Sequence, residues 1–296
     1  MIAVFGSTNM DLVATVAALP APGETVPGRD HFAAPGGKGA NQALAAARAG
    51  ASVRFVSAVG RDAHAAPALA LLRAAGADLT ATHAVDGPTG VALILVDAAG
   101  ENVIAVVPGA NASLGVARAA DLALGPGDTL LAQFEAPAPG VAAALRAARD
   151  AGALSILNPA PYLPDARALL SEADLVIVNE GEGAAALGAP LPEEPEAAVE
   201  MLAEALGTDV ALTLGPRGAA MRRQGETFRA ASPRIEAVDA TGAGDAFCGH
   251  MAAAFDRGEP PQRALDIACA AGAAACLGQG AQPAAPTLAQ ALALLP

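Results

Sequence analysis

The feature that most constrains the fold is an alternation of continuous apolar runs with alanine-rich segments. Apolar runs lie at residues 2–6, 53–60, 129–134, 154–159, 174–179 and 210–215. Alanine-rich segments of helical character separate most of them, at 39–49, 64–76, 138–151 and 195–206. Runs that are apolar throughout indicate strands buried on both faces, and helices between them indicate right-handed crossovers. The sequence therefore predicts an α/β fold with a mostly parallel central sheet.

Two regions interrupt this alternation. Residues 10–35 are rich in proline and glycine and contain no long helical segment, whereas residues 90–109 read as two strands around a turn at Ala99 and Gly100. Two β segments that interrupt a βα array can pair as a small lid over the ends of the strands. We therefore expect a single domain, 1–296, with a lid formed by two insertions, at about 10–35 and 88–109.

The composition excludes several classes of protein. A net charge of −13 argues against binding to nucleic acid or to anionic membranes, which attract basic patches. The longest apolar run, 267–278, is shorter than the roughly 20 residues of a membrane span. The first residues lack the basic region of a signal peptide, so the expected compartment is cytoplasmic. The three cysteines indicate buried thiols, and the four histidines lack metal-ligand spacing.

The stretch "APGGKGANQA" (34–43) contains the only lysine of the chain, Lys38; every other basic residue is arginine. It is not a Walker A loop, because Lys38 is followed by Gly39 and Phe32 stands in the place of the first glycine. Its glycines indicate close approach of the backbone to a small polar ligand. The ammonium of Lys38 and the amide of Asn41 suit hydroxyl groups and a nearby phosphate. The alternative is a solvated lysine in a loop.

A second glycine cluster, "VDATGAGDAF" (238–247), precedes a predicted helix that runs to about residue 257. Glycines at a helix start allow several free N–H groups to point at one spot, and the helix dipole adds to this anion hole. Asp245 would repel a simple phosphate. It fits a site that holds a transferring phosphoryl group while the carboxylate takes a proton from the attacking hydroxyl. The alternative is an ordinary helix start with Asp in its first turn.

Further polar residues follow the predicted strands, where ligands of open α/β sheets bind. Asp11, close to Asn9, can accept hydrogen bonds from adjacent hydroxyls of a sugar. Asn179 and Glu182 could face one way at a helix start and order the waters of Mg2+, although a capping arrangement explains them equally well. The glycine-rich turn 213–218 could run beneath a nucleotide. Each of these residue types is also common in plain turns.

Taken in order, the motifs match one known family. They are "GSTNMD", "PGETV", "GGKGANQA", "TGVALILVDAAGENVI", "NPAP", "VNEGE", "TLGPRG" and "ATGAGDAF". In order and rough spacing, from residue 2 to about 290, the chain resembles the ribokinase branch of the PfkB carbohydrate kinases. The resemblance implies a ribokinase-like three-layer sandwich with a mostly parallel central sheet and a small β-sheet lid. It also implies a homodimer through the lid.

The activity that this resemblance implies is ATP-dependent phosphorylation of the primary hydroxyl of D-ribose, which gives D-ribose 5-phosphate. The alternative is another PfkB-family kinase that acts on a ketohexose, a deoxysugar or a nucleoside. A non-catalytic sugar sensor of the same fold would be expected to lack Asp245. A nucleotide-dependent oxidoreductase is disfavoured because the turn after the first strand has only one glycine, Gly6.

The resemblance also implies roles for individual residues, by their position in the motifs. Asp245 would be the catalytic base, beside an anion hole built from Gly242, Ala243 and Gly244, in which the last two supply N–H groups. The sugar would be held by Asn9, Asp11, Gly37, Lys38, Asn41 and Glu135. The nucleotide site would include Asn179, Thr213, Gly215, Arg217, Gly218, Gly244 and Cys269.

Two cations are implied in the same way. Glu182 would help to position Mg2+. A monovalent cation, K+ in this family, would lie near Asp239, Thr241, Ala275, Gly278 and Gly280. Ala284 stands where the family often has a serine, so one side-chain ligand to this cation is absent. Cys269 replaces a frequent histidine or asparagine, which leaves open whether it contacts adenine.

Overall fold

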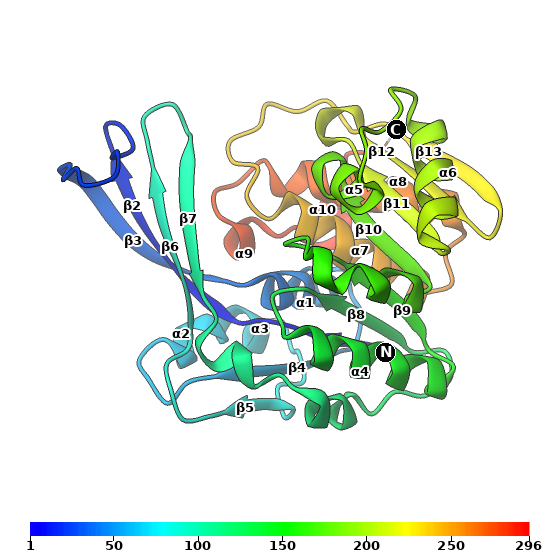
Figure 1. The fold of residues 1–296 in the computed structure, drawn as a ribbon, viewed down its shortest axis with the longest axis horizontal. Coiled ribbons are helices and arrows are strands. Elements are labelled where there is room, and N and C mark those ends of the chain that lie inside the picture. The colour runs from blue at the N-terminus through cyan, green and yellow to red at the C-terminus, as the bar shows by residue number, and fades with distance from the viewer. Residues whose placement is uncertain (296) are drawn as a thin grey trace.

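The computed structural model describes residues 1–295, and the body of this part is a nine-stranded sheet in the order β13-β12-β11-β10-β9-β8-β1-β4-β5 (Figure 1). The strands from β5 to β11 pair in parallel, and β12 and β13 are antiparallel. Their bounds are β1 Ile2–Phe5, β4 Val53–Val59, β5 Thr82–Ala84, β8 Thr129–Gln133, β9 Leu154–Asn158, β10 Leu175–Asn179, β11 Asp209–Thr213, β12 Ala219–Arg223 and β13 Glu226–Ala230. The six predicted strands and their parallel pairing are confirmed.

Helices cover both faces of this sheet, because side chains alternate between the faces along every buried strand. In β1, Ala3 and Phe5 pack in one apolar cluster with residues of α4 and α6, whereas Ile2 and Val4 pack in a second cluster with residues of α1, α7 and α8. The main helices are α1 Lys38–Arg48, α4 Ala138–Ala151, α5 Glu180–Leu187, α6 Pro195–Leu206, α7 Ala243–Asp256 and α8 Pro261–Ala275. The predicted three-layer sandwich is confirmed.

Short helical segments complete the body. The segment 64–76, predicted as one helical stretch, forms two short helices that meet at Leu69. The short segments are α2 Ala65–Ala68, α3 Ala70–Ala74, η1 Gly109–Ser113, η2 Val116–Leu122, η3 Pro164–Glu172, η4 Gly215–Arg217, α9 Ala281–Ala284 and α10 Leu288–Leu292. None of the helices in the described part of the chain combines the length and the apolarity that crossing a bilayer requires.

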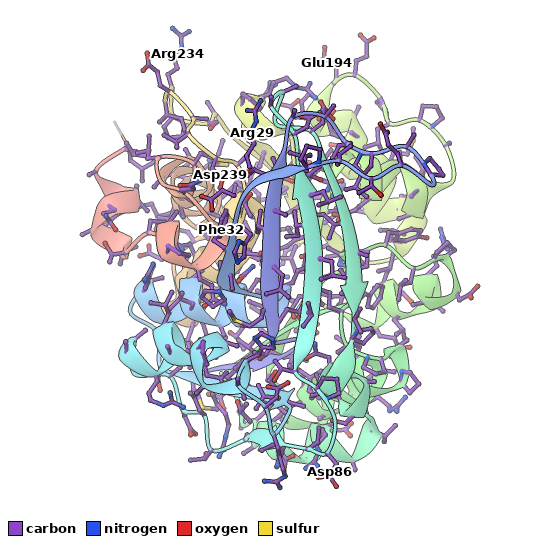
Figure 2. All side chains as sticks on the ribbon, turned by 90° about the vertical axis from the view of Figure 1, so that its left-hand side faces the viewer. Arg29, Phe32, Asp86, Glu194, Arg234 and Asp239 are labelled. Atoms are coloured by element: carbon purple, nitrogen blue, oxygen red, sulfur yellow. The ribbon has the colours of Figure 1, made fainter. Side chains whose placement is uncertain are left out.

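A separate four-stranded sheet stands beside the body and faces the viewer in Figure 2. Its order is β3-β2-β6-β7, and its strands are β2 Asn9–Val16, β3 Gly28–Gly36, β6 Gly90–Val96 and β7 Asn102–Val107. The small sheet therefore draws on both interruptions of the βα alternation. Residues 10–35, in which the sequence indicated no long helix, supply the antiparallel pair β2 and β3.

The carboxyl ends of the parallel strands position the site. Asn158, Asn179 and Thr213 are the last residues of β9, β10 and β11, and Glu135 lies just beyond β8. Helices α1 and α7 pack against each other, and both begin close to this edge of the sheet.

Candidate active site

The start of α1 is pressed against the chain that leaves β1. Gly37, the residue before the helix, has φ 89°, and a Cβ there would lie 2.8 Å from the Asn9 nitrogen. A Cβ on Gly39 would lie 2.4 Å from the Ser7 nitrogen. No other residue fits at either position without moving the backbone. The two glycines therefore bring Lys38 and Asn41 to the end of β1.

The first N–H groups of α1 are taken up by the protein itself. The Lys38 N–H donates to Glu135 Oε2 at 3.0 Å, and the Gly39 N–H donates to Ser7 Oγ at 3.2 Å. The Ser7 hydroxyl in turn donates to the same Glu135 oxygen at 2.6 Å, and the Ala40 N–H donates to the Ser7 carbonyl at 2.8 Å. The start of α1 is therefore not an anion hole. Its bonds hold the Glu135 carboxylate against the backbone at the start of the helix.

The start of α7 is open. Gly242 has φ 80°, and a Cβ there would lie 2.7 Å from Ala281. The Ala243 N–H donates to the Ala240 carbonyl at 3.2 Å, whereas the N–H groups of Gly244 and Asp245 have no acceptor within residues 1–295. The Ala243 N–H was expected in the anion hole, but it is already bonded within the turn at Gly242. The amides free to bind an anion are those of Gly244 and Asp245.

The carboxylate of Asp245 joins the two helices. Its Oδ2 accepts from Asn41 Nδ2 at 2.9 Å, and its Oδ1 accepts from Gln42 Nε2 at 3.0 Å. Asp245 is buried, with 8% of its surface exposed. The Asn41 Oδ1 is also buried and has no hydrogen-bond partner in the described chain. It can therefore accept a hydrogen bond from a hydroxyl of a ligand.

Asn9 and Asp11 lie in the first stretch of chain after β1, at the start of β2 in the small sheet. Asn9 Oδ1 accepts from Asn111 Nδ2 at 2.8 Å, and Asn9 Nδ2 donates to Glu135 at 3.5 Å. Asp11 lies against Gly36, where a Cβ would fall 2.2 Å from its carboxylate. Burial, with smaller contributions from Glu135 and Asp245, raises the pKa of Asp11 to about 6. An acidic group in this position suits a ligand that donates hydrogen bonds, such as a sugar diol.

A cavity of about 470 Å³ connects the two helix starts to the ends of β9, β10 and β11. Lys38 and Asp245 both line it, so the structure brings together the two residues on which the proposed chemistry depends. Burial lowers the pKa of Lys38, but the nearby Asp245, Glu135 and Glu182 outweigh this and raise it. Lys38 is thus held in its charged form. Of the residues expected at the nucleotide site, Asn179, Thr213, Gly215 and Gly244 line this cavity.

Asn179 and Glu182 form a capping box at the start of α5. The Asn179 side chain accepts from the Glu182 N–H at 2.8 Å, and Glu182 Oε2 accepts from the Asn179 N–H at 3.0 Å. Burial raises the pKa of Glu182, and the Asn179 N–H and Lys38 oppose the shift. The capping alternative is therefore correct for Asn179. Glu182 also lines the cavity and uses only Oε2 in the cap.

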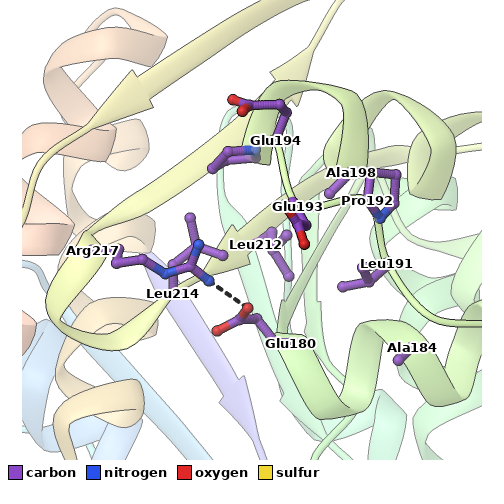
Figure 3. A pocket seen from close by; sticks show the side chains of 11 residues that line it. Glu180, Ala184, Leu191, Pro192, Glu193, Glu194, Ala198, Leu212, Leu214 and Arg217 are labelled. Atoms are coloured by element: carbon purple, nitrogen blue, oxygen red, sulfur yellow. Dashed lines mark hydrogen bonds and ion pairs between the residues drawn. The ribbon is translucent and has the colours of Figure 1, made fainter.

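Three residues expected near the nucleotide lie outside this cavity. Arg217 forms an ion pair with Glu180 and lines a neighbouring cavity of about 510 Å³ (Figure 3). Gly218 has φ 93°, and a Cβ there would lie 2.0 Å from the Ala230 carbonyl oxygen, so this glycine serves the turn into β12. Cys269 is buried in the core with residues of α7 and the sheet, and burial raises its pKa to about 12. Cys269 is not among the residues that line this cavity.

The residues expected around a monovalent cation form a compact group. Asp239 Oδ1 accepts from both the N–H and the hydroxyl of Thr241, and its Oδ2 accepts from the Gly280 N–H at 2.8 Å. Gly278 lies against Ala284, with a Cβ built on Gly278 2.9 Å from the Ala284 methyl. Carbonyl oxygens of this group, including that of Ala275, are candidate ligands. No cluster of three or more His, Cys, Asp or Glu residues suited to a metal occurs within residues 1–295.

Four contributors to the site were not identified from the sequence, whereas Asn158, expected at this edge as the polar end of its strand, does line the cavity. The four are Ser7, Gln42, Asn111 and Gln133, all of which are buried and hydrogen-bonded to site residues or to one another. A signal was present for Gln133, a polar residue inside an otherwise apolar strand. Gln42 lies within the quoted lysine stretch, one residue beyond Asn41. Asn111 carried no local signal, because its contact with Asn9 joins distant parts of the chain.

Comparison with known proteins agrees with this geometry. A family model described as "pfkB family carbohydrate kinase" matches residues 1–288. The chain belongs to the PfkB family of carbohydrate kinases. As a PfkB protein it is a phosphotransferase that acts on a sugar hydroxyl, which confirms the expected class of enzyme. The sensor and oxidoreductase alternatives are thereby set aside.

Individual PfkB relatives cover almost the whole chain. A ribokinase of Haemophilus influenzae is 35% identical over 297 residues, which span 99% of this chain and 97% of the relative. A deoxyribokinase of Salmonella typhi is 31% identical over 98% of this chain and 96% of its own length. The structure of Arabidopsis thaliana ribokinase complexed with ribose and ATP superposes with a TM-score of 0.88 at 30% identity. It covers 99% of this chain and 97% of the other.

Proposed function

We propose that this protein transfers the γ-phosphoryl group of ATP to the primary hydroxyl of D-ribose and so produces D-ribose 5-phosphate. The observation that carries the proposal is the buried Asp245 carboxylate, held between Asn41 and Gln42 directly beside two free helix amides. A base and an anion hole in contact suit the transfer of a phosphoryl group to a hydroxyl. Similarity to ribokinases over nearly the full length supports ribose as the acceptor.

In the proposed mechanism, positioning and charge do most of the work, because the transition state of phosphoryl transfer is loose. Asp245 orients the primary hydroxyl and accepts its proton. The N–H groups of Gly244 and Asp245 bind the oxygens of the transferring phosphoryl group at the positive end of α7. Lys38 adds a fixed positive charge within the same cavity.

The proposed sugar site is the polar surface between α1 and the small sheet. Asp11 accepts from two adjacent hydroxyls of the sugar. Asn41 uses its unpartnered Oδ1 to accept from a further hydroxyl. The remaining polar groups come from Asn9, Lys38 and Glu135, and the absent side chain of Gly37 allows close approach of the ligand to the backbone.

The proposed nucleotide site extends along the cavity past Asn179, Thr213 and Gly215. Arg217 and Gly218 contribute only through the turn that follows β11. Glu182 would hold Mg2+ through a free oxygen and water, since this cation commonly uses one or two carboxylates together with phosphate oxygens. When bound, Mg2+ supplies charge neutralisation on the phosphates of ATP.

We also propose that K+ binds near Asp239 and Thr241 and that Ala284 weakens it by supplying no side-chain oxygen. Activity in K+ should then exceed activity in Na+ only slightly, and Ala284→Ser should widen the difference. Assays at fixed ionic strength with the two chlorides measure this. A variant whose activity is equal in both salts contradicts the assigned cation site.

The small sheet is proposed to be a lid over the sugar site and to pair with the lid of a second copy. Its strands expose several large apolar side chains, among them Leu93 (50% exposed), Val103 (56%) and Ile104 (51%). Neighbouring residues of β2, β3, β6 and β7 line an apolar hollow of about 570 Å³ on this sheet. Because monomers rarely expose such patches, Leu93→Glu should convert a dimer into a monomer in light-scattering measurements. A wild-type monomer contradicts the proposal.

A deoxysugar is the second candidate acceptor, because the Salmonella relative is a deoxyribokinase. A coupled assay of ADP release with D-ribose, 2-deoxy-D-ribose, D-fructose and adenosine distinguishes the candidates. We expect the highest kcat/KM with D-ribose, since Asp11 has two oxygens for two neighbouring hydroxyls. If kcat/KM is higher with 2-deoxy-D-ribose, the deoxysugar and not ribose is the substrate. Since ATP is a cytoplasmic metabolite, we propose that compartment for the reaction.

A further inference from the structure

We propose that Gln42 is a positioning residue for phosphoryl transfer, which orients the Asp245 carboxylate through a chain of amide hydrogen bonds that begins at Gln133. The inference rests on Asp245 acting as the base in the proposed function. The chain runs from Gln133 Nε2 to Gln42 Oε1 at 2.7 Å and from Gln42 Nε2 to Asp245 Oδ1 at 3.0 Å.

The direction of every bond in this chain is set by the carboxylate. An ionised carboxylate can only accept hydrogen bonds, so Gln42 must turn its NH2 group toward Asp245. Its carbonyl oxygen then faces Gln133, which must donate. The same Gln42 nitrogen also donates to Asn158 Oδ1 at 3.0 Å, and Asn158 Nδ2 donates to the Ile177 carbonyl of β10 at 2.9 Å. The amide plane of Gln42 is thus held from three sides.

The buried amide of Gln133, which anchors this chain, is unfavourable for the fold. Gln133 is completely buried in β8, and its Oε1 has no hydrogen-bond partner among the described residues. A buried amide oxygen without a partner has lost its hydrogen bonds to water, a cost that an apolar residue at this strand position would avoid. Gly6 makes the arrangement possible, because a Cβ there would lie 2.1 Å from that oxygen. The bond that Gln133 donates to Gln42 gives a polar side chain at this position a role in the site.

Asn41 and Gln42 each donate a hydrogen bond to a different oxygen of the Asp245 carboxylate. Asn41 holds Oδ2 and keeps its own oxygen available to a ligand, whereas both polar atoms of Gln42 are bonded within the protein. Gln42 has no exposed surface and does not line the cavity. Its loss should therefore change how the base is aimed, and it should leave the binding of sugar and ATP nearly unchanged.

The experiment compares Gln42→Met with Gln42→Glu in the kinase assay. Gln42→Met removes the donor without adding charge and should lower kcat about 10²-fold, as expected when a base is misplaced by about 1 Å. The KM values for sugar and ATP should stay within about threefold, because mutations that affect only the transition state leave uniform binding intact. Gln42→Glu preserves the shape but puts a second carboxylate against Asp245, and at pH 8 it should be slower than Gln42→Met.

The pH dependence of Gln42→Glu separates positioning from packing. Two adjacent carboxyls share a proton as the pH falls, and a protonated carboxyl at position 42 can donate to Asp245 again. The activity of Gln42→Glu relative to wild type should therefore rise between pH 8 and pH 6, while that of Gln42→Met stays flat. If Gln42 only fills space, the isosteric Gln42→Glu variant will be nearer to wild type than the Gln42→Met variant at every pH. That result overturns the inference.

Two further variants control for folding and for the role of the base. Gln262→Met, in α8, removes a side chain with two hydrogen bonds far from the site and should leave kcat unchanged. Gln42→Met combined with Asp245→Asn should be no slower than Asp245→Asn alone, because the first change acts only through the second. Additive losses overturn the inference.

The failure of the inference and the failure of the proposed function give different results. A wild-type enzyme that prefers another acceptor overturns the choice of ribose, and the same variants then test the positioning with that acceptor. A fully active Asp245→Asn variant overturns the assignment of Asp245 as the base, and with it the positioning role of Gln42. If Gln42→Met folds poorly, Gln133→Leu tests the same chain of hydrogen bonds from its other end. It should lower kcat about 10-fold at unchanged KM, and a change in KM alone contradicts the chain.

Discussion

Two helices of this protein, α1 and α7, both begin in glycine-rich sequence, yet their first turns are built differently. At α1, the N–H groups of Lys38 and Gly39 are occupied by Glu135 and Ser7. At α7, the N–H groups of Gly244 and Asp245 have no acceptor among residues 1–295. One start is closed by the protein's own oxygen atoms and positions side chains. The other leaves its amides available to an anion.

The glycines differ in the same way. A Cβ on Gly39 would lie 2.4 Å from backbone atoms, whereas a Cβ on Gly244 would meet nothing within 4 Å. Gly39 thus allows two chain segments to touch, and Gly244 keeps space free within the cavity. A cluster of glycines before a helix can therefore indicate either close packing of two chain segments or free space for a ligand. What neighbouring strands bring to the helix start decides whether it serves the fold or the ligand.

The largest effect is expected from the carboxylate at the open helix. Asp245→Asn should lower kcat about 10³-fold, since a positioned base contributes about 10²–10⁴-fold. The affinity for ATP should change little. Steady-state kinetics with calorimetry of nucleotide binding measures both. A variant within tenfold of wild type would remove Asp245 from the role of base.

The second-largest effect is expected from the charge of Lys38 at the start of α1. Lys38→Arg keeps the charge but introduces a wider, planar group between Gly37 and Gly39. It should fold normally and lose about 10²-fold in kcat/KM for the sugar, as expected for a displaced catalytic charge. Circular dichroism melts establish folding, and sugar titrations give kcat/KM. An unchanged kcat/KM would show that Lys38 needs only its charge.

A matched pair of glycine variants tests the comparison itself. Gly244→Ala should keep or slightly raise the melting temperature, because alanine is the better helix former by about 1 kcal/mol. It should lower kcat about 10-fold, since the added methyl enters the space proposed for the phosphoryl group. Gly39→Ala should instead lower the melting temperature, because its methyl collides with the backbone of Gly6 and Ser7. Equal behaviour of the two variants in melting and kinetics contradicts the distinction.

The smallest effect is a pH dependence of sugar binding. The pKa of Asp11 is raised to about 6, so its carboxylate is charged above that pH and protonated below it. The KM for the sugar should rise several-fold as the pH falls through about 6, when the carboxylate loses acceptor capacity. Asp11→Asn should bind the sugar weakly without this dependence. A pH-independent KM in the wild type would show that Asp11 does not contact the sugar.

The same shift gives a stability prediction of known sign. The raised pKa means that the folded protein holds this proton more tightly than the unfolded chain, so the charged form disfavours folding above pH 6. Asp11→Asn should therefore melt at a higher temperature than wild type at pH 8. The difference should shrink toward pH 5. A variant less stable at pH 8 contradicts the assigned burial.

Much of the fold was accessible from the sequence, because buried parallel strands are apolar along their whole length. The runs that became β1, β4, β8, β9, β10 and β11 carry this signature. β2 and β3 do not, since they belong to the small sheet and are separated by a proline- and glycine-rich turn. The hairpin of β12 and β13 was also missed. β13 is the edge strand of the sheet, and only one of its five residues is buried.

The site was predictable where function needs a rare residue type or a glycine, and less so where it depends on tertiary contacts. Lys38, Asn41 and Asp245 stood out in their motifs. The use of the Ala243 amide by Ala240 could not be read from spacing, because it depends on the turn at Gly242. Cys269 was placed near the nucleotide by analogy of position, and in the structure it packs in the core and does not line the cavity.

The most direct test is a crystal structure of Asp245→Asn with D-ribose and ATP. The account predicts the primary hydroxyl within about 3.2 Å of the side-chain amide at position 245, the reach of a catalytic hydrogen bond. It also predicts γ-phosphate oxygens at the N–H groups of residues 244 and 245. A phosphate bound instead at the start of α1, or a sugar remote from residue 245, would contradict it.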